Sequence, residues 1–213
     1  KASLRHCAEK LVKYPVARSR FVATEACRRA GNAAAFIAEV KAELGLALEV
    51  ISSEEEARLA LLGCCSLLER GIKRVLAFDI GGGSTEVMWV ETPPSYHEAA
   101  EPVFPFAPSI RSWCSLPHGV MSLSEAMGED AYAELYYDQT VARLSEHLAP
   151  LARKEQVPEW ARHESTQLPS TSGTVTTLAA IYLGLPRYSR ARVDGLKLSV
   201  KDLQKSVAQV RAM

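Results

Sequence analysis

The sequence predicts an α/β protein, and three observations carry this prediction. Residues 74–80 (RVLAFDI) form a short, mostly apolar run that stops at three glycines, which is typical of a strand buried on both faces of a sheet. Between residues 25 and 44 the apolar side chains instead recur at steps of three and four, the period of an amphipathic helix. Runs of both kinds follow each other along the 213 residues, which is the order expected of an α/β domain.

Helix breakers and caps set the elements in the first half of the chain. A helix over 2–13 should end before Pro15, because proline lacks the N–H that a helix interior needs. Residues 18–23 are a strand candidate, and the helix over 25–44 should end at Gly45. There follow a strand over 47–51, a helix from Ser53 to about residue 69, and strands over 74–80 and 86–90, which a glycine turn joins into a hairpin.

The second half is less regular. Five prolines between residues 92 and 108 predict a connecting loop. Ser199 is a predicted helix cap, so a closing helix should run from there to Met213. Between these segments, the expected elements are a strand over 109–116, helices over 122–127 and 129–152, a loop over 156–169, a helix over 175–183 and a short strand or turn over 192–198.

The composition excludes several classes of protein. Lys and Arg number 25, and so do Asp and Glu, so the chain lacks the broad positive field of a general nucleic-acid or membrane-surface binder. We expect neither nucleic acid nor a membrane as a partner, since the apolar runs are far shorter than the ~20 residues that span a bilayer. The five cysteines lack the spacing of a metal or redox site, which predicts buried thiols and a cytoplasmic location.

The strongest local signal for chemistry is the run DIGGGSTE over residues 79–86. Its three glycines can adopt positive φ and let backbone N–H groups converge on an anion. The carboxylates at its ends, Asp79 and Glu86, suit a Mg²⁺ ion and its waters, so the run favours a phosphate chain with magnesium. It is not a Walker loop, because no Gly-Lys-Ser/Thr occurs. The alternative is a glycine-rich hairpin turn that binds nothing.

Two further segments lie at predicted helix starts. Ser172, Gly173 and Thr174 precede an apolar helix, and the amides at a helix N-terminus attract anions. An ordinary Ser/Thr cap is the alternative there. Ser53 and Glu56 have the spacing of a capping box, which accounts for the acids at this helix start without any chemistry. In the functional interpretation, one glutamate orients and deprotonates an attacking water.

Two arginines and a histidine complete the candidates. Arg28 or Arg29, at a helix start, could hold a phosphate with its planar guanidinium, although a solvated surface arginine is the commoner outcome. His118 lies in the run LPHG over residues 116–119 and has no evident serine or cysteine partner, so we interpret it as a loop residue.

Together and in this order, these segments resemble the exopolyphosphatase / guanosine pentaphosphate phosphohydrolase family. The run DIGGGSTE occurs in looser form across the wider actin-like and sugar-kinase superfamily, whereas ATEACR, SEEEAR and SGTVTTLAA narrow the resemblance. Residues 91–112 and 126–167 are its weak parts. The matching segments are VATEACRRAGNAAAF (22–36), EVISSEEEARLALLG (49–63), VLAFDIGGGSTEVMWV (75–90), SLPHGVMSLSE (115–125), STSGTVTTLAAIYLGLPRY (170–188) and RVDGLKLS (192–199).

The resemblance implies an actin-like, ribonuclease H-like fold of two lobes, with a phosphate chain lying between them. It implies Mg²⁺-dependent hydrolysis of the terminal phosphate of a linear phosphoanhydride, which is inorganic polyphosphate or guanosine pentaphosphate. By position, Glu56 matches the family's water-activating base, and Asp79 and Glu86 match carboxylates tied to metal and phosphate. The matched phosphate-binding residues are Arg28, Gly81, Gly82, Gly83, Ser84, Gly173 and Thr174, and Asn32 matches a residue that lines the cleft.

One departure concerns the ends of the chain. The family's first strand and its Asp-x-Gly-Ser-Asn phosphate loop have no counterpart here, and the chain stops within its last helix. We therefore expect a fold truncated at both ends, with residues 1–72 as the remainder of the first lobe and 73–213 as an incomplete second lobe. A nucleotide-binding actin-like regulatory module and an inactive fragment stay open as alternatives, a homodimer is left open, and a sugar-kinase-like phosphotransferase ranks low.

Overall fold

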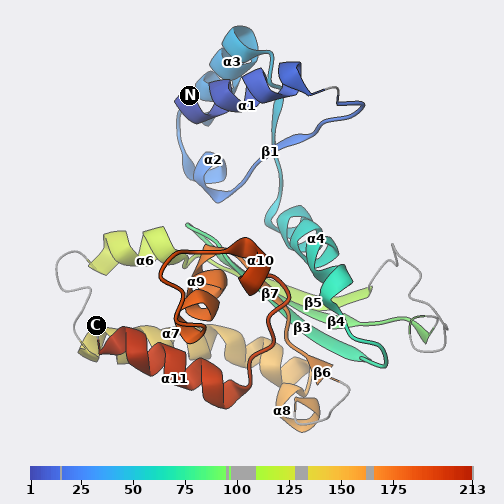
Figure 1. Ribbon diagram of the computed structural model, residues 1–213, viewed down its shortest axis with the longest axis vertical. Coiled ribbons are helices and arrows are strands. Elements are labelled where there is room, and N and C mark those ends of the chain that lie inside the picture. Colours follow the sequence, from blue (N-terminus) through green and yellow to red (C-terminus); the bar gives the residue numbers. More distant parts are fainter. Residues whose placement is uncertain (15, 95, 97–108, 128–133, 162–165, 213) are drawn as a thin grey trace. The chain divides into compact units, whose positions relative to one another are not determined.

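The computed structural model of the chain describes residues 1–14, 16–94, 96, 109–127, 134–161 and 166–212 (Figure 1). Contacts divide the chain into two compact units, Lys1–Glu56 and Ala57–Met213, and the boundary lies within helix α4 (Ser53–Cys64). Each unit combines helices with strands, so the expected α/β class is confirmed. The division into lobes 1–72 and 73–213 stays a prediction.

The first unit contains two short parallel strands. β1 (Phe21–Ala23) pairs with β2 (Leu48–Val50), with Phe21 opposite Leu48. Both strands lie within the segments that the sequence predicts as strands. Helix α1 (Ala2–Lys13) precedes them and has the predicted bounds.

The helix that the sequence predicts over 25–44 is instead two helices, α2 (Glu25–Arg29) and α3 (Ala33–Leu44). The prediction of one helix is wrong because Ala30 leaves the helical conformation, with φ −71° and ψ 122°, and a new helix begins after Asn32. Gly45 ends α3 in the left-handed conformation, with φ 69°, as the sequence predicts.

The second unit is built on a sheet in the order β5-β4-β3-β6, with β7 also paired to β3. β3 (Arg74–Ile80), β4 (Thr85–Glu91) and β5 (Ser109–Leu116) form an antiparallel meander, which confirms the predicted hairpin and the predicted strand after it. β6 (Thr166–Gln167) and β7 (Ser170–Thr171) pair in parallel with β3. The loop expected over 156–169 is therefore wrong in part, since it contains helix α8 (Val157–Trp160) and β6.

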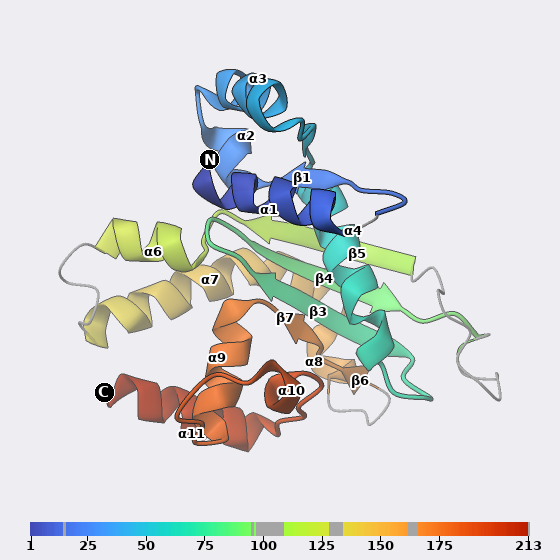
Figure 2. The ribbon, with the colours of Figure 1, turned by 45° about the horizontal axis from the view of Figure 1, so that its top comes forward.

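Both faces of this sheet are covered by other parts of the unit, as the burial of β4 at every position from residue 86 to residue 90 shows. Ala57 and Leu61 of α4 pack in one core with Val75, Ala77 and Met88 of the hairpin. Figure 2 shows α4 crossing in front of the three strands of the meander. Helix α9 (Gly173–Tyr182) contacts β3, α7 (Glu134–Lys154) contacts β5, and α11 (Val200–Arg211) contacts α9.

The other described elements of the second unit are short. The helix predicted to continue to about residue 69 ends at Cys64 and passes into a 3-10 turn, η1 (Cys65–Leu67). The strand or turn expected over 192–198 is wrong at its start, where α10 (Arg190–Val193) forms a helical turn. Helix α6 (Val120–Met127) begins two residues before its predicted start. The predicted cap of α11 is confirmed, since the Ser199 hydroxyl accepts a hydrogen bond from the Asp202 N–H at 3.1 Å.

Two predicted segments lie partly outside the described residues. They are the proline-rich loop, of which 95 and 97–108 are not described, and the helix over 129–152, of which 129–133 are not described. Within the described residues, no helix combines the length and the apolar character needed to cross a membrane.

Candidate functional site

The glycine loop, residues 81–84, joins β3 to β4 at the end of the hairpin. The Gly81 N–H donates a hydrogen bond to the Ser84 carbonyl at 2.9 Å, which closes the turn, and Ser84 is only 3% exposed. Gly81 and Gly82 do not adopt the left-handed conformation, so the expectation of positive φ is wrong for these two residues. At Gly81 the constraint is space instead, because an added Cβ would lie 3.2 Å from the Ser84 carbonyl oxygen.

The two predicted metal carboxylates flank this loop. Asp79 and Glu86 lie directly opposite each other in the β3–β4 ladder, so their side chains project from the same face, with Cβ atoms about 5 Å apart. The same face carries Ala77 and Met88 and is covered by α4. Glu86 is 1% exposed, and its Oε1 accepts a hydrogen bond from the Ser115 hydroxyl at 2.9 Å. A carboxylate buried to this degree needs such donors.

Thiols lie near both carboxylates. Burial, and then the negative charge of Asp79, raises the pKa of Cys64 to about 11. Burial, and then the charge of Glu86, raises the pKa of Cys114. Such thiols stay protonated at neutral pH and are poor nucleophiles. The prediction of buried thiols is confirmed for Cys64 and Cys65 and is wrong for Cys7, which is exposed.

The carboxylate pair offers oxygen donors of the kind that magnesium prefers, although one of them, Glu86, is almost completely buried. Mg²⁺ is commonly held by one or two carboxylates together with waters and substrate phosphates, and Asp79 and Glu86 provide two such donors on one face. Across the part of the chain that the structure describes, no cluster of three or more His, Cys, Asp or Glu side chains could hold a metal. An ion held here would need water or substrate oxygens as its remaining ligands, and Asp79 is the more accessible of the two donors because Glu86 is only 1% exposed.

A groove of about 600 Å³ joins the glycine loop to the N-terminus of α9. Gly81 and Gly82 line it together with Gly173 and Thr174, so the structure brings together two segments that the sequence predicts separately as anion sites. Ile80 also lines the groove and follows Asp79 along β3, so the groove and the carboxylates lie on opposite faces of this strand. The rest of the lining is mainly apolar: Val120, Leu178, Ile181 and Val210, with Ser172 and Thr177.

Ser172, at the start of α9, has an unusual backbone. Its φ is 100° and its ψ is 167°, a region that only glycine visits readily. The hydroxyl makes no capping bond to the helix, and its oxygen is buried without a hydrogen-bond partner among the described atoms. The alternative of an ordinary serine cap is therefore wrong at this position.

In the first unit, the structure brings Arg28 and Glu56 together. The Arg28 guanidinium donates to Glu56 Oε2 at 2.8 Å, to Glu25 Oε2 at 3.0 Å and to the Ile51 carbonyl at 2.9 Å. Burial lowers the pKa of Arg28, but its hydrogen bonds with Glu56 and then Glu25 raise the pKa above its usual value overall. Arg29, by contrast, is a solvated side chain with 67% exposure.

The capping box predicted at Ser53 is displaced by one residue. The Ser52 hydroxyl accepts a hydrogen bond from the Glu55 N–H at 3.1 Å, while Ser53 is already the first residue of α4. Glu56 is therefore not needed for the reciprocal bond of a capping box at Ser53. Its carboxylate is instead held by Arg28.

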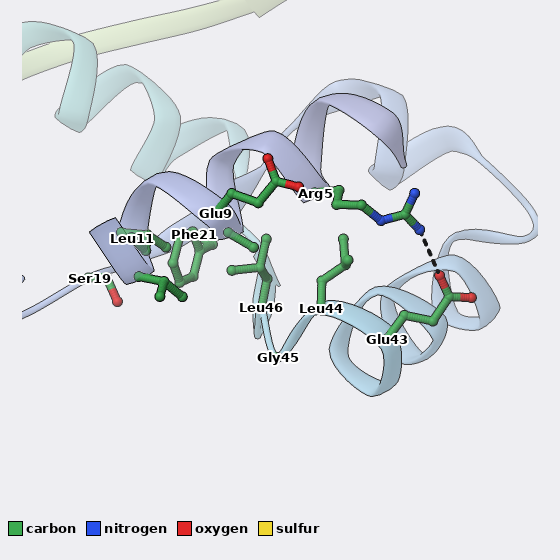
Figure 3. Close-up of a pocket in the computed structure, with 11 residues that line it drawn as sticks. Arg5, Glu9, Leu11, Ser19, Phe21, Glu43, Leu44, Gly45 and Leu46 are labelled. Atoms are coloured by element: carbon green, nitrogen blue, oxygen red, sulfur yellow. Dashed lines mark ion pairs between the residues drawn. The ribbon is translucent and has the colours of Figure 1, made fainter. Parts of the chain in front are cut away.

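A second cavity, of about 480 Å³, lies wholly within the first unit and contains none of the predicted site residues (Figure 3). Leu11, Phe21 and Leu46 line it, and the Arg5 guanidinium lies 3.8 Å from the Glu43 carboxylate at one end.

The residues that sequence analysis missed are Gly119 and Ser122, just before and within the start of α6. Gly119 is buried against the glycine loop, and the Thr85 hydroxyl donates to the His118 carbonyl at 2.7 Å. The available signal was the glycine of LPHG directly before a helix start. The composition of this run does not show that Gly119 contacts the backbone of the glycine loop.

A sequence profile described as the Ppx/GppA phosphatase family matches residues 1–212. Among solved structures, the Aquifex aeolicus family member is 28% identical with a TM-score of 0.72, and the match covers 100% of this chain and 61% of that one. An exopolyphosphatase-like protein is 29% identical with a TM-score of 0.79, covering 100% and 62%. An exopolyphosphatase from Cytophaga hutchinsonii, at 23% identity and a TM-score of 0.73 over 99% and 62%, shares the fold.

These matches agree with the α/β class described above. The chain spans 61–62% of the length of these solved structures. The profile match extends over almost every residue, so the resemblance seen in the sequence is confirmed and this chain belongs to the Ppx/GppA phosphatase family.

Proposed function

We propose that the protein carrying this chain hydrolyses the terminal phosphate of a linear phosphoanhydride, inorganic polyphosphate or guanosine pentaphosphate, with Mg²⁺ as cofactor. The observation that carries the proposal is the meeting of Gly81 and Gly82 with Gly173 and Thr174 in one groove. Both segments present backbone with little side-chain bulk, which suits the close approach of phosphate oxygens to amide N–H groups. Membership of a phosphatase family supports the same reaction class.

Hydrolysis of a phosphoanhydride depends mainly on positioning and on stabilisation of charge. In our proposal, the backbone N–H groups of Gly82, Gly83 and Ser84 and of the start of α9 hold the phosphate oxygens, because the Gly81 N–H already donates to the Ser84 carbonyl. Asp79 and Glu86 would hold the cofactor at the end of the hairpin, from the face of β3 opposite the groove. Magnesium, when bound, supplies neutralisation of the charge that develops on the phosphate oxygens. The Ser115 hydroxyl keeps the buried Glu86 carboxylate in place.

Glu56 is the proposed general base, which accepts a proton from the attacking water. The hydrogen bond from Arg28 fixes its Oε2, which leaves Oε1 for the water. We also propose Arg28 as a phosphate ligand. Because it already donates to Glu25 and to the Ile51 carbonyl, a phosphate contact would replace one of these bonds.

Phosphate release by the full-length protein tests this proposal, with polyphosphate and guanosine pentaphosphate each assayed with and without Mg²⁺. Glu56→Gln should lower kcat by roughly 10²–10⁴-fold with little change in KM, the usual contribution of general-base catalysis. Glu54→Gln is the matched control, since Glu54 is an exposed acid in the same helical turn. Wild-type turnover in Glu56→Gln would remove Glu56 from the chemistry.

One observation favours a second candidate, a nucleotide-binding regulatory module. The groove beside Gly173 and Thr174 has an apolar wall that includes Leu178 and Ile181, which an inorganic phosphate chain would not need. Tight ATP binding by the full-length protein, without phosphate release from any of the substrates, would favour this function over hydrolysis.

A further inference from the structure

The first amides of α6 are bonded to the glycine loop. Val120 N–H donates to the Gly81 carbonyl at 3.0 Å, and the N–H groups of Met121 and Ser122 donate to the Gly82 carbonyl at 2.8 and 3.1 Å. The first N–H groups of a helix normally lack partners within the helix and bind caps, water or ligands. Here three of them bind the loop that we propose to hold phosphate.

Gly119 makes this contact sterically possible. A Cβ built on Gly119 would lie 2.5 Å from both the Gly81 carbonyl oxygen and the Gly82 carbonyl carbon, and 2.6 Å from the Gly82 carbonyl oxygen. All three are backbone atoms, so no side chain can move aside to make room. Any other residue at position 119 would therefore push the glycine loop away from α6.

Two side-chain hydrogen bonds hold the 118–122 segment in this position. The Ser122 hydroxyl accepts a hydrogen bond from the Gly119 N–H at 2.8 Å, which fixes the turn that leads into α6. At the other end, the Thr85 hydroxyl donates to the His118 carbonyl at 2.7 Å, which ties the segment to the first residue of β4.

The bonds to α6 also fix the direction of the loop amides. In a planar trans peptide the N–H points opposite to the C=O. Because the carbonyls of Gly81 and Gly82 face α6, the N–H groups of Gly82 and Gly83 in the same two peptides face away from it. These N–H groups belong to the loop that is proposed to bind phosphate oxygens.

From this geometry we infer that the 118–122 segment positions the phosphate-binding loop, with Gly119 and Ser122 as positioning residues. This inference rests on the proposed function. It adds that catalytic efficiency depends on two residues that touch neither the phosphate nor the attacking water, and that Gly119 tolerates no side chain.

The test measures two properties of each variant of the full-length protein. They are kcat and KM for phosphate release, and the rate of amide hydrogen exchange in a peptide that covers residues 79–86. Ser122→Ala should lower kcat/KM about 5-fold, the effect of losing a typical helix cap, and should speed exchange in this peptide. Ser122→Thr keeps the hydroxyl and should restore both. Gly119→Ala should lower kcat/KM by about 100-fold or more, comparable to removing one oxyanion donor.

Gly63→Ala is the matched control, because a Cβ at Gly63 meets nothing within 4 Å in the same unit. It should leave kinetics and exchange as in wild type. If Gly119→Ala does not fold, the comparison of Ser122→Ala with Ser122→Thr decides whether the 118–122 segment positions the loop. Unchanged exchange in residues 79–86 of Ser122→Ala overturns the inference, whereas faster exchange supports it even if the wild-type protein hydrolyses neither substrate and the proposed function fails.

Discussion

Replacing Ser172 by glycine should stabilise the second unit. The residue adopts φ 100° and ψ 167°, where a Cβ is strained and glycine is not. Its hydroxyl oxygen is also buried without a partner among the described atoms, so its removal leaves nothing unsatisfied.

Three effects set the size of the change in the free energy of unfolding. Relief of backbone strain at a glycine-only conformation contributes about 1–3 kcal/mol. Removal of an unsatisfied buried hydroxyl contributes about 1–3 kcal/mol, which is the usual desolvation penalty of such a group. The greater freedom of glycine in the unfolded chain costs roughly 0.5–1 kcal/mol. The net gain is therefore at least about 1 kcal/mol.

Thermal unfolding of the full-length protein measures this gain. In a unit of this size, 1 kcal/mol corresponds to a rise in Tm of about 2–4 °C. Ser172→Ala is the control, because it removes the hydroxyl but keeps a Cβ at the strained position, so its Tm should fall between wild type and Ser172→Gly. A Tm for Ser172→Gly that does not exceed the Tm of Ser172→Ala would refute the assignment of strain.

Two further predictions concern titratable groups. Burial, and then the neighbouring His147 and Arg143, hold the pKa of His118 below its usual value. As pH drops, the unfolded chain therefore takes up a proton at this histidine before the folded protein does, so the free energy of unfolding should fall below about pH 6.5. Urea unfolding at about pH 7.5 and about pH 5.5 measures this fall, which should be smaller in His118→Gln than in wild type. Burial, and then the charge of Asp79, raise the pKa of Cys64 to about 11. Iodoacetamide at mildly alkaline pH should therefore label the exposed Cys7 well before Cys64, as intact mass and peptide mapping would show. Equal labelling rates of the two thiols in the folded protein would contradict the described burial of Cys64.

Local composition predicts a helix or strand well where glycines or capping side chains mark its ends in the sequence. β3 has the predicted bounds, because an apolar run ends at glycines, and the cap at Ser199 follows from a side chain that bonds its own helix. The break between α2 and α3 escapes the same reasoning, because the apolar stripe continues in phase across Gly31. β6 and β7 escape it because each has two residues and pairs with a strand far earlier in the chain.

The residues of the candidate site show the same difference between features that local composition marks and features that depend on distant contacts. The glycines of the β3–β4 loop and the start of α9 are visible in sequence because their own composition favours anions, and the structure places them in one groove. Gly119 is not visible, since its requirement comes from a contact with the backbone of Gly81 and Gly82. The cap of α4 is at Ser52 rather than Ser53 because adjacent serines offer the same hydroxyl, and only the backbone decides between them.

The strand order has a consequence for biosynthesis. On the ribosome, β3, β4 and β5 can pair once residue 116 has emerged, but the other edge of β3 finds its partners only when residues 166–171 follow. At ordinary translation speeds this delay lasts on the order of 3–10 s. During that interval the free edge of β3 can recruit strands from another nascent chain. Chaperones that shield this edge should therefore raise the yield of folded protein, and point mutations in the distant β6 and β7 should lower it.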